Sequence, residues 1–137
     1  MSPRADGRRS PCTITDARAR LHDTAAFLEA AKSLQDPDVI ATNAIHAAIA
    51  AADATCCVAL RERSADGNHA AAIELLGRVD KSLSAALKRA LGRKNQAAYE
   101  SRDISVSDAK MSVRQADLLV AAARQRILSL TCLLIEG

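Results

Sequence analysis

A short basic segment holds the residue types in this chain that are best suited to chemistry. It reads RKNQAAYESR from Arg93 to Arg102 and contains the single tyrosine, Tyr99. On a continuous helix, four polar side chains of this region fall within about 60° of one another: Lys88, Asn95, Tyr99 and Arg102. A tyrosine hydroxyl beside cations and an amide can hold a phosphate, or act as an acid once its pKa falls. The alternative is that the Tyr99 ring packs against a neighbouring helix and its hydroxyl bonds a carbonyl.

The charge around this segment suits a polyanion. The net charge of the whole chain is only +3, from 19 basic and 16 acidic residues. Positions 78 to 102 nevertheless carry seven basic residues against Asp80 and Glu100. Such a density suits phosphate binding, although many helices carry it merely to stay solvated. Four of these cations form what we call the basic stripe: Lys88, Arg93, Lys94 and Arg102.

A loop earlier in the chain offers a second candidate. Arg63 and His69 are separated by five residues, which include the turn-forming sequence Asp-Gly-Asn. In one interpretation His69 simply opens the helix that follows the turn. In the other, the loop folds over the basic stripe and brings His69 to it.

A third candidate lies in an alanine-rich stretch. Its polar side chains share one side of the expected helix: Asn43, His46, Asp53 and Cys57. Buried polar groups must find partners, so we consider two arrangements. The residues form a hydrogen-bonded cluster that fixes the helix register, or a pocket in which His46 or Asp53 meets an arginine of the basic stripe.

The cysteine and histidine spacing does not indicate a metal centre. The four cysteines form no CxxC motif, and the three histidines lie far apart without the spacing of a zinc site. Adjacent Cys56 and Cys57 rarely bridge each other or bind one ion. We therefore expect reduced, partly buried thiols in a cytoplasmic protein, with no metal and no cofactor.

The elements that position these residues are predicted to be helices. Half of the chain is hydrophobic (49%), yet it has no tryptophan and only one phenylalanine. An alanine- and leucine-based core favours helices over strands and excludes a β-sandwich or a barrel. It also excludes modules that stack several bases on aromatic rings. No apolar run reaches the roughly 18 residues of a membrane span and the N-terminus resembles no export signal, so we expect no membrane association.

The predicted architecture is an all-α, up-and-down bundle of four to five helices. Residues 1–12 contain two prolines and three arginines without periodicity, and we expect a disordered tail there, followed by a single domain over residues 13–137. Helix-start signals and turns predict helices near residues 15–34, 39–62, 69–78, 81–99 and 105–135. The final turns of the last helix, ILSLTCLLI, are apolar on every side. They predict a homodimer through this helix, or else a plug at the end of the chain's own bundle.

The stretch LKRALGRKNQAAYESRDISVSDAK, together with the long alanine-rich second helix, resembles small prokaryotic proteins of the HEPN superfamily. The likeness covers roughly residues 15–130. It implies an up-and-down helical bundle that usually dimerises. Active HEPN members are metal-independent ribonucleases with an Arg-x(4–6)-His motif, often in toxin–antitoxin systems. Others are inactive partners of nucleotidyltransferases, or nucleotide-binding modules.

Transferred residue by residue, the resemblance gives Arg93 the role of the family arginine and Asn95 that of the polar residue after it. Tyr99 occupies the place of the family histidine. A histidine titrates near neutral pH, whereas tyrosine has a reference pKa near 10, which disfavours catalysis. We therefore expect a module that binds RNA, a nucleotide or a nucleic-acid-modifying partner through the basic stripe, with a nucleotidyltransferase or an antitoxin as the protein partner. The alternative is a ribonuclease in which Arg93 stabilises the phosphate and His69, His46 or Tyr99 transfers protons.

Overall fold

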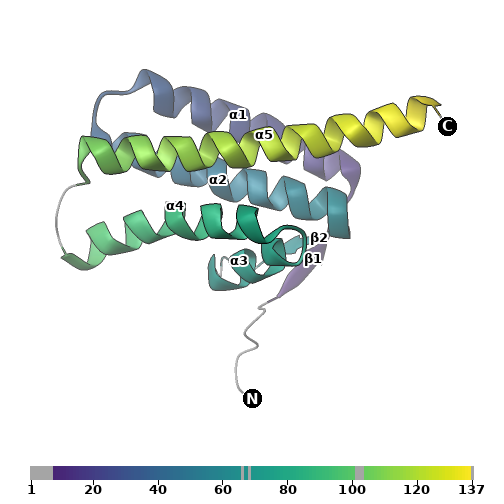
Figure 1. Ribbon diagram of the computed structural model, residues 1–137, viewed down its shortest axis with the longest axis horizontal. Coiled ribbons are helices and arrows are strands. Elements are labelled where there is room, and N and C mark those ends of the chain that lie inside the picture. Colours follow the sequence, from purple (N-terminus) through teal and green to yellow (C-terminus); the bar gives the residue numbers. More distant parts are fainter. Residues whose placement is uncertain (1–7, 66, 68, 101–103, 137) are drawn as a thin grey trace, which may run out of the picture.

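The computed structural model describes residues 8–65, 67, 69–100 and 104–136, and leaves the side chains of residues 93–100 and 131–136 outside that description. The described chain folds into a helical bundle with one small two-stranded ribbon (Figure 1). The helices are α1 (Ile14–Ser33), α2 (Pro37–Leu60), α3 (His69–Gly77), α4 (Lys81–Glu100) and α5 (Val106–Glu136), and the strands are β1 (Arg9–Pro11) and β2 (Glu62–Ser64). The predicted all-α bundle is confirmed.

The helices begin where the sequence supplies caps. The Thr13 hydroxyl accepts a hydrogen bond from the amide of Asp16 at 3.1 Å, and the Asp16 carboxylate accepts one from the Thr13 amide at 2.8 Å. Asp36, Asp80 and Ser105 accept bonds from the first-turn amides of α2, α4 and α5. Each such cap stabilises its helix by about 1 kcal/mol. The predicted helix starts therefore lie within a few residues of the observed ones.

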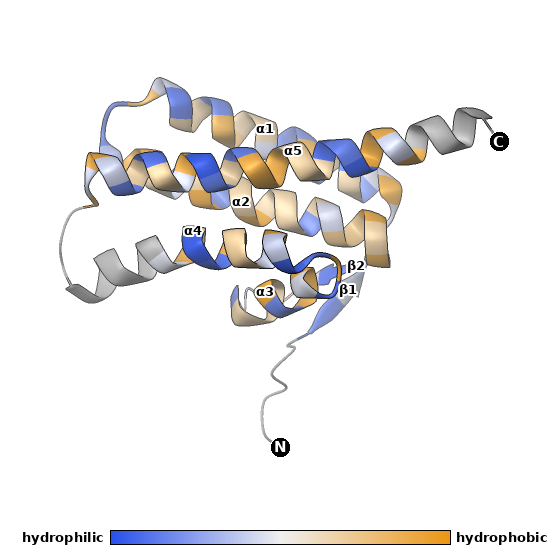
Figure 2. Cartoon of the chain, viewed as in Figure 1, coloured by the Kyte–Doolittle hydropathy of each residue, from blue (hydrophilic) through white to orange (hydrophobic). Residues whose placement is uncertain are grey.

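Helix α2 forms the centre of the bundle. It packs most extensively against α1 and α5 (Figure 1), and its surface is dominated by small apolar residues (Figure 2). Ala44, Ala47, Ala48 and Ala51 are fully buried. Because alanine has a small side chain, α1 approaches closely enough for the Thr24 hydroxyl to donate a hydrogen bond to the Ala47 carbonyl.

By length and composition alone, α2 could also cross a membrane, but 67% of its most apolar window is buried inside the bundle. The core helix of a soluble protein passes the same test. Its apolar character is therefore accounted for by α1, α4 and α5, which pack against it.

Helices α3 and α4 and the two-stranded ribbon extend the bundle on one side (Figure 1). Helix α4 packs against α3, α5 and α2, and the Ser84 hydroxyl donates to the Ile73 carbonyl at 2.7 Å, which joins α4 to α3. Strand β2 and helix α3 form the connection between α2 and α4 (Figure 1). This connection is where the chain leaves the main helical layer, and it carries the polar residues described below.

The N-terminal prediction is wrong for residues 9–12. Strand β1 pairs antiparallel with β2, with Arg9 opposite Ser64 and Pro11 opposite Glu62. The strands have little intrinsic preference to pair, and the sequence shows no alternation there, so the pairing depends on contacts distant in sequence. Residues 1–7 lie outside the described part of the chain.

The expectation of reduced thiols is also wrong for two cysteines. Cys12, which directly follows β1, forms a disulfide with Cys57 of α2, and their Cα atoms are 5.4 Å apart. Both cysteines are buried. Cys56 is free and buried, and the side chain of Cys132 lies outside the described residues.

Candidate functional site

Three segments converge around a small cavity. It has a volume of about 210 Å³ and lies between α1, α2 and the connection formed by β2 and α3. Polar side chains from all three segments line it: Arg20, Asp53, Arg63, Ser64 and His69. Ile49 and Ala72 supply its apolar wall. The two residues of the early loop motif therefore line one cavity with Asp53 of the alanine-rich helix.

An ion pair forms the base of this cavity. Arg20 Nη2 donates to Asp53 Oδ2 at 2.8 Å, and the exposed fractions of the two side chains are 34% and 9%. Arg20 Nη1 also lies 3.8 Å from the carboxylate of the more exposed Asp23. The pair fastens α2 to α1 and gives the buried Asp53 the partner that its burial requires.

Burial raises the pKa of Asp53 above its ordinary value, because removing the carboxylate from water penalises its charged form. The hydrogen bond and charge of Arg20, and then the charge of Arg63, act in the opposite direction. The effect of Arg63 on this pKa indicates that its guanidinium contributes positive potential at the cavity. Asp53 is the one carboxylate among the described residues that line the cavity, so the arginines leave an excess of positive charge.

Two donors at the cavity lack partners. Arg20 Nε and the Ser64 hydroxyl are buried and make no hydrogen bond to any described residue. Arg63 Nη1 makes one long contact of 3.4 Å with the Ser64 carbonyl. A buried donor without an acceptor is costly in free energy. The cavity lining therefore carries positive charge, and two enclosed donors beside it have no acceptor among the described residues.

The remaining predicted site residues lie elsewhere or outside the described residues. His46 is exposed on α2, where its ring and that of Phe27 are nearly perpendicular, with 5.4 Å between the ring centroids. Lys88 is exposed on α4. The other residues of the proposed α4 site have undescribed side chains: Arg93, Lys94, Asn95, Tyr99 and Arg102. Helix α4 ends at Glu100, before Arg102.

Arg20 is a candidate site residue that the sequence motifs do not single out. It lies three residues after Ala17 and four before Thr24, both of which are buried, so its position falls on the inward side of α1. A cation at such a position requires an acidic partner. Asp53 is the single acidic residue in the interior of the alanine-rich stretch, so the sequence signals that each of the two residues needs a partner, while their pairing follows from the packing of α1 against α2.

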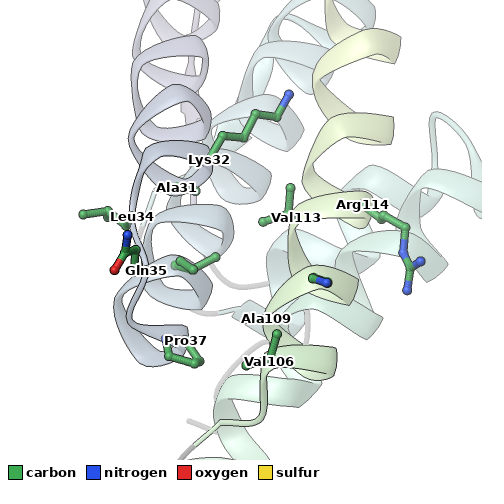
Figure 3. Close-up of a pocket in the computed structure, with 11 residues that line it drawn as sticks. Ala31, Lys32, Leu34, Gln35, Pro37, Val106, Ala109, Val113 and Arg114 are labelled. Atoms are coloured by element: carbon green, nitrogen blue, oxygen red, sulfur yellow. The ribbon is translucent and has the colours of Figure 1, made fainter.

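A larger hollow at the opposite end of α2 offers less chemistry. It has a volume of about 460 Å³ and lies between the α1–α2 turn and the start of α5 (Figure 3). Aliphatic side chains such as Val106 and Val113 form much of its surface. Lys32 and Arg114 lie at its edges in Figure 3, and Lys32 is paired with Asp117 at 3.0 Å. The lining contains no histidine, cysteine or carboxylate, so this hollow provides no group for acid–base catalysis near neutral pH.

Cys56 and metal chemistry do not contribute a second reactive centre within the described residues. Burial, followed by the nearby charge of Asp53, raises the pKa of Cys56 to about 12. Its thiol therefore stays protonated and is a poor nucleophile. Among these residues no group of three or more histidine, cysteine or acidic side chains is placed to hold a metal ion.

Comparison of the chain with protein-family models, with curated proteins and with solved structures finds no match.

Proposed function

We propose that this protein binds a phosphate group of RNA or of a nucleotide in the cavity lined by Arg20, Arg63, Ser64 and His69. The observation that carries the proposal is the combination of two guanidinium groups and an imidazole around one volume. Guanidinium groups match the geometry of phosphate oxygens. Because Asp53 is already paired with Arg20, it leaves the positive potential of Arg63 available to an anion.

The size of the cavity limits which part of a ligand it can enclose. Its volume of about 210 Å³ is below the roughly 300–1,000 Å³ of pockets that enclose drug-sized molecules. It fits a phosphate group, while the sugar and base of the ligand would extend over the surface. The resemblance to HEPN proteins, which remains a proposal, favours RNA or a nucleotide. The basic stripe of α4 is the alternative location for the same phosphate contact.

Fluorescence anisotropy with a labelled single-stranded RNA tests this proposal. Binding should weaken as salt rises, because phosphate contacts release counterions. Arg63→Ala should lower the affinity about tenfold, since it removes a charged contact, and His69→Ala should lower it less. Arg124→Ala, which removes an exposed charge from α5, is the matched control and should change little.

The same titration separates the two locations. If Lys88→Ala and Arg93→Ala weaken binding while Arg63→Ala behaves like the Arg124→Ala control, the phosphate binds to the basic stripe and the cavity proposal is wrong. If wild-type protein shows no salt-sensitive binding to RNA or to a nucleotide, the proposed function is wrong at both locations.

A metal-independent ribonuclease is the second candidate, favoured by the presence of Arg63 and His69 at one cavity. The imidazole of His69 would take the proton of a ribose 2′-hydroxyl as its oxygen attacks the adjacent phosphorus. The bond from phosphorus to the 5′-oxygen would break, the 5′-oxygen would take a proton from water, and Arg63 would stabilise the negative charge that develops on the phosphate. The products would be a 2′,3′-cyclic phosphate and a 5′-hydroxyl end.

Incubation of purified protein with RNA in EDTA tests this candidate. Cleavage that His69→Ala abolishes and Arg124→Ala preserves would support it. Cleavage lost instead in Arg93→Ala and Tyr99→Phe would move the chemistry to α4, and the absence of cleavage would leave binding alone.

We also propose that the protein forms a homodimer through the C-terminal part of α5. Leu128 is 54% exposed, and Leu130 lies beside a hollow of about 330 Å³ that Val58 and Ala59 line from α2. Ile127, by contrast, is buried against Cys12 and Cys57 and is used within the protein's own bundle. A two-fold partner would cover the exposed part of this apolar surface.

A further inference from the structure

We propose that the Cys12–Cys57 disulfide is a redox latch that holds the phosphate cavity in its binding shape. This inference rests on the proposed function, and it assigns a means of regulation to the same cavity. The inference starts from the position of the disulfide close to β2, the strand that carries the cavity residues Arg63 and Ser64. Cys12 directly follows β1, and Cys57 lies in the last turn of α2, shortly before β2.

The disulfide is connected to the cavity wall by a short series of bonds. The Cys12 amide donates to the Arg61 carbonyl at 2.9 Å, and the Arg61 amide donates to the Cys57 carbonyl at 3.1 Å. Arg61 has a left-handed backbone conformation with φ of 57°, which turns the chain from α2 into β2. The position of β2 thus depends on the two residues that the disulfide joins.

Strand β2 carries two of the cavity residues. In the ribbon, Arg63 is opposite Ser10 and Ser64 is opposite Arg9, and the Ala65 amide donates to the Arg8 carbonyl at 3.0 Å. Release of β1 would therefore remove the strand that pairs with Arg63 and Ser64, together with the flanking hydrogen bonds of Arg61 and Ala65. Both side chains would then lose their fixed positions at the cavity.

The ribbon is too small to hold itself together. Each strand has three residues, and an isolated two-stranded ribbon is at best marginally stable in water. The disulfide closes a sequence separation of 45 residues and so keeps β1 next to β2 at little further entropic cost. Without that bond, we expect β1 to separate from β2 for much of the time.

The chemistry of the latch is a dithiol–disulfide exchange. A thiolate of a dithiol reductant, of the kind that keeps cytoplasmic thiols reduced, attacks the Cys12 sulfur, and Cys57 leaves as a thiolate and takes a proton. The second thiol of the reductant then displaces Cys12, which also ends as a thiol, and the reductant becomes a disulfide. Because Cys12 and Cys57 are buried, the ribbon must open before attack. If the protein is cytoplasmic, as its sequence predicts, the two cysteines would form this disulfide only under oxidising conditions.

RNA anisotropy on oxidised and dithiothreitol-reduced protein tests the latch, with circular dichroism to confirm that the helices persist. Reduction should weaken binding about tenfold, as expected when a charged contact is lost. Cys12→Ser should bind weakly with or without reductant. Cys56→Ser, which keeps the disulfide, should respond as wild type does. Equal affinity of the oxidised and reduced proteins would overturn the latch and leave the proposed function standing.

Hydrogen exchange provides a readout that needs no ligand. Amides of Arg9, Ser10 and Cys12 and of residues 62–65 should exchange faster after reduction, whereas those of the middle of α2 should not. If oxidised protein fails to bind RNA but shows this local change, the proposed function fails and the redox-dependent movement stands. Unchanged exchange in both segments would overturn the latch even if Cys12→Ser could not be purified.

Discussion

Replacing Arg20 by methionine should destabilise the protein in a strongly pH-dependent way. The substitution keeps most of the aliphatic volume of the side chain but removes the guanidinium that bonds Asp53 at 2.8 Å. The Asp53 side chain is only 9% exposed, so its charge would remain buried without this partner. Removal of one member of a buried pair costs about 3–5 kcal/mol. Because the Arg20 side chain is 34% exposed, we expect a cost near the lower limit, about 3 kcal/mol at pH 8.

The pH dependence follows from the direction of the Asp53 pKa. Burial holds this pKa above its ordinary value of 3.8 in the folded protein, and losing Arg20 would raise it further. Between the unfolded and folded values the folded state binds more protons, so stability falls as pH rises through this window. The cost of Arg20→Met should therefore be greatest above the folded pKa of Asp53 and should shrink on acidification, as the carboxyl takes up a proton.

Urea denaturation followed by circular dichroism at pH 5, 6, 7 and 8 would measure these differences. Asp53→Asn should lose part of the same stability. The double variant should lose less than the sum of the two single losses, because the partners are in contact. Arg124→Met is the control for loss of an exposed cation. A cost for Arg20→Met that is independent of pH, or strict additivity in the double variant, would refute this account of the pair.

Four further perturbations probe the rest of the structure. Cys12→Ser, or reductant added to wild type, should lower the free energy of unfolding by about 2–4 kcal/mol, since the closed loop spans 45 residues. A wild-type melting temperature that is the same with and without reductant would argue against the disulfide. Iodoacetamide should modify Cys56 only after unfolding, because its thiol is buried and its pKa is raised to about 12; mass spectrometry of the native protein would reveal early alkylation if this is wrong. Ala48→Leu should cost about 1–3 kcal/mol or more by overpacking a fully buried position, and a urea midpoint equal to wild type would contradict the close packing around α2. Leu128→Asp should convert the proposed dimer into a monomer in light scattering, and a wild-type mass of 14.5 kDa would show that the dimer does not form.

The helices were predictable because their signals are local. A cap such as Asp36 or Asp80 acts on amides two or three residues away, and an alanine-rich stretch favours helix regardless of its surroundings. The ribbon was not predictable in this way. Strand β1 pairs with a segment more than 50 residues later in the chain, and neither strand has the alternating pattern that marks a half-buried strand. The disulfide between Cys12 and Cys57 was unpredictable for the same reason, because the sequence alone does not specify which cysteines meet.

The candidate site was predictable in parts but not as a whole. Asp53, Arg63 and His69 are each predicted from the sequence as candidate site residues. Their common location depends on the path of the chain from α2 through β2 into α3. One of the two arrangements considered for the polar residues of α2 pairs His46 or Asp53 with an arginine of the basic stripe, whereas the structure pairs Asp53 with Arg20 of α1. Spacing within one helix gives the direction of a side chain, but the neighbour on that side follows from the packing of the whole bundle.

The alanine-rich core explains why the site lies at its margin. Fully buried alanines on α2 bring α1 close and leave little room between the helices for a ligand or for the side chains that would bind one. The Arg20–Asp53 pair joins α1 to α2, and further polar residues reach it from β2 and α3, which connect α2 to α4. A segment outside the tightly packed layer needs another source of order. In the proposed latch the disulfide supplies it at the turn from α2 into β2, so Arg63 and Ser64 are positioned by a bond that responds to redox conditions, whereas Arg20 and Asp53 are positioned by the packing of α1 against α2.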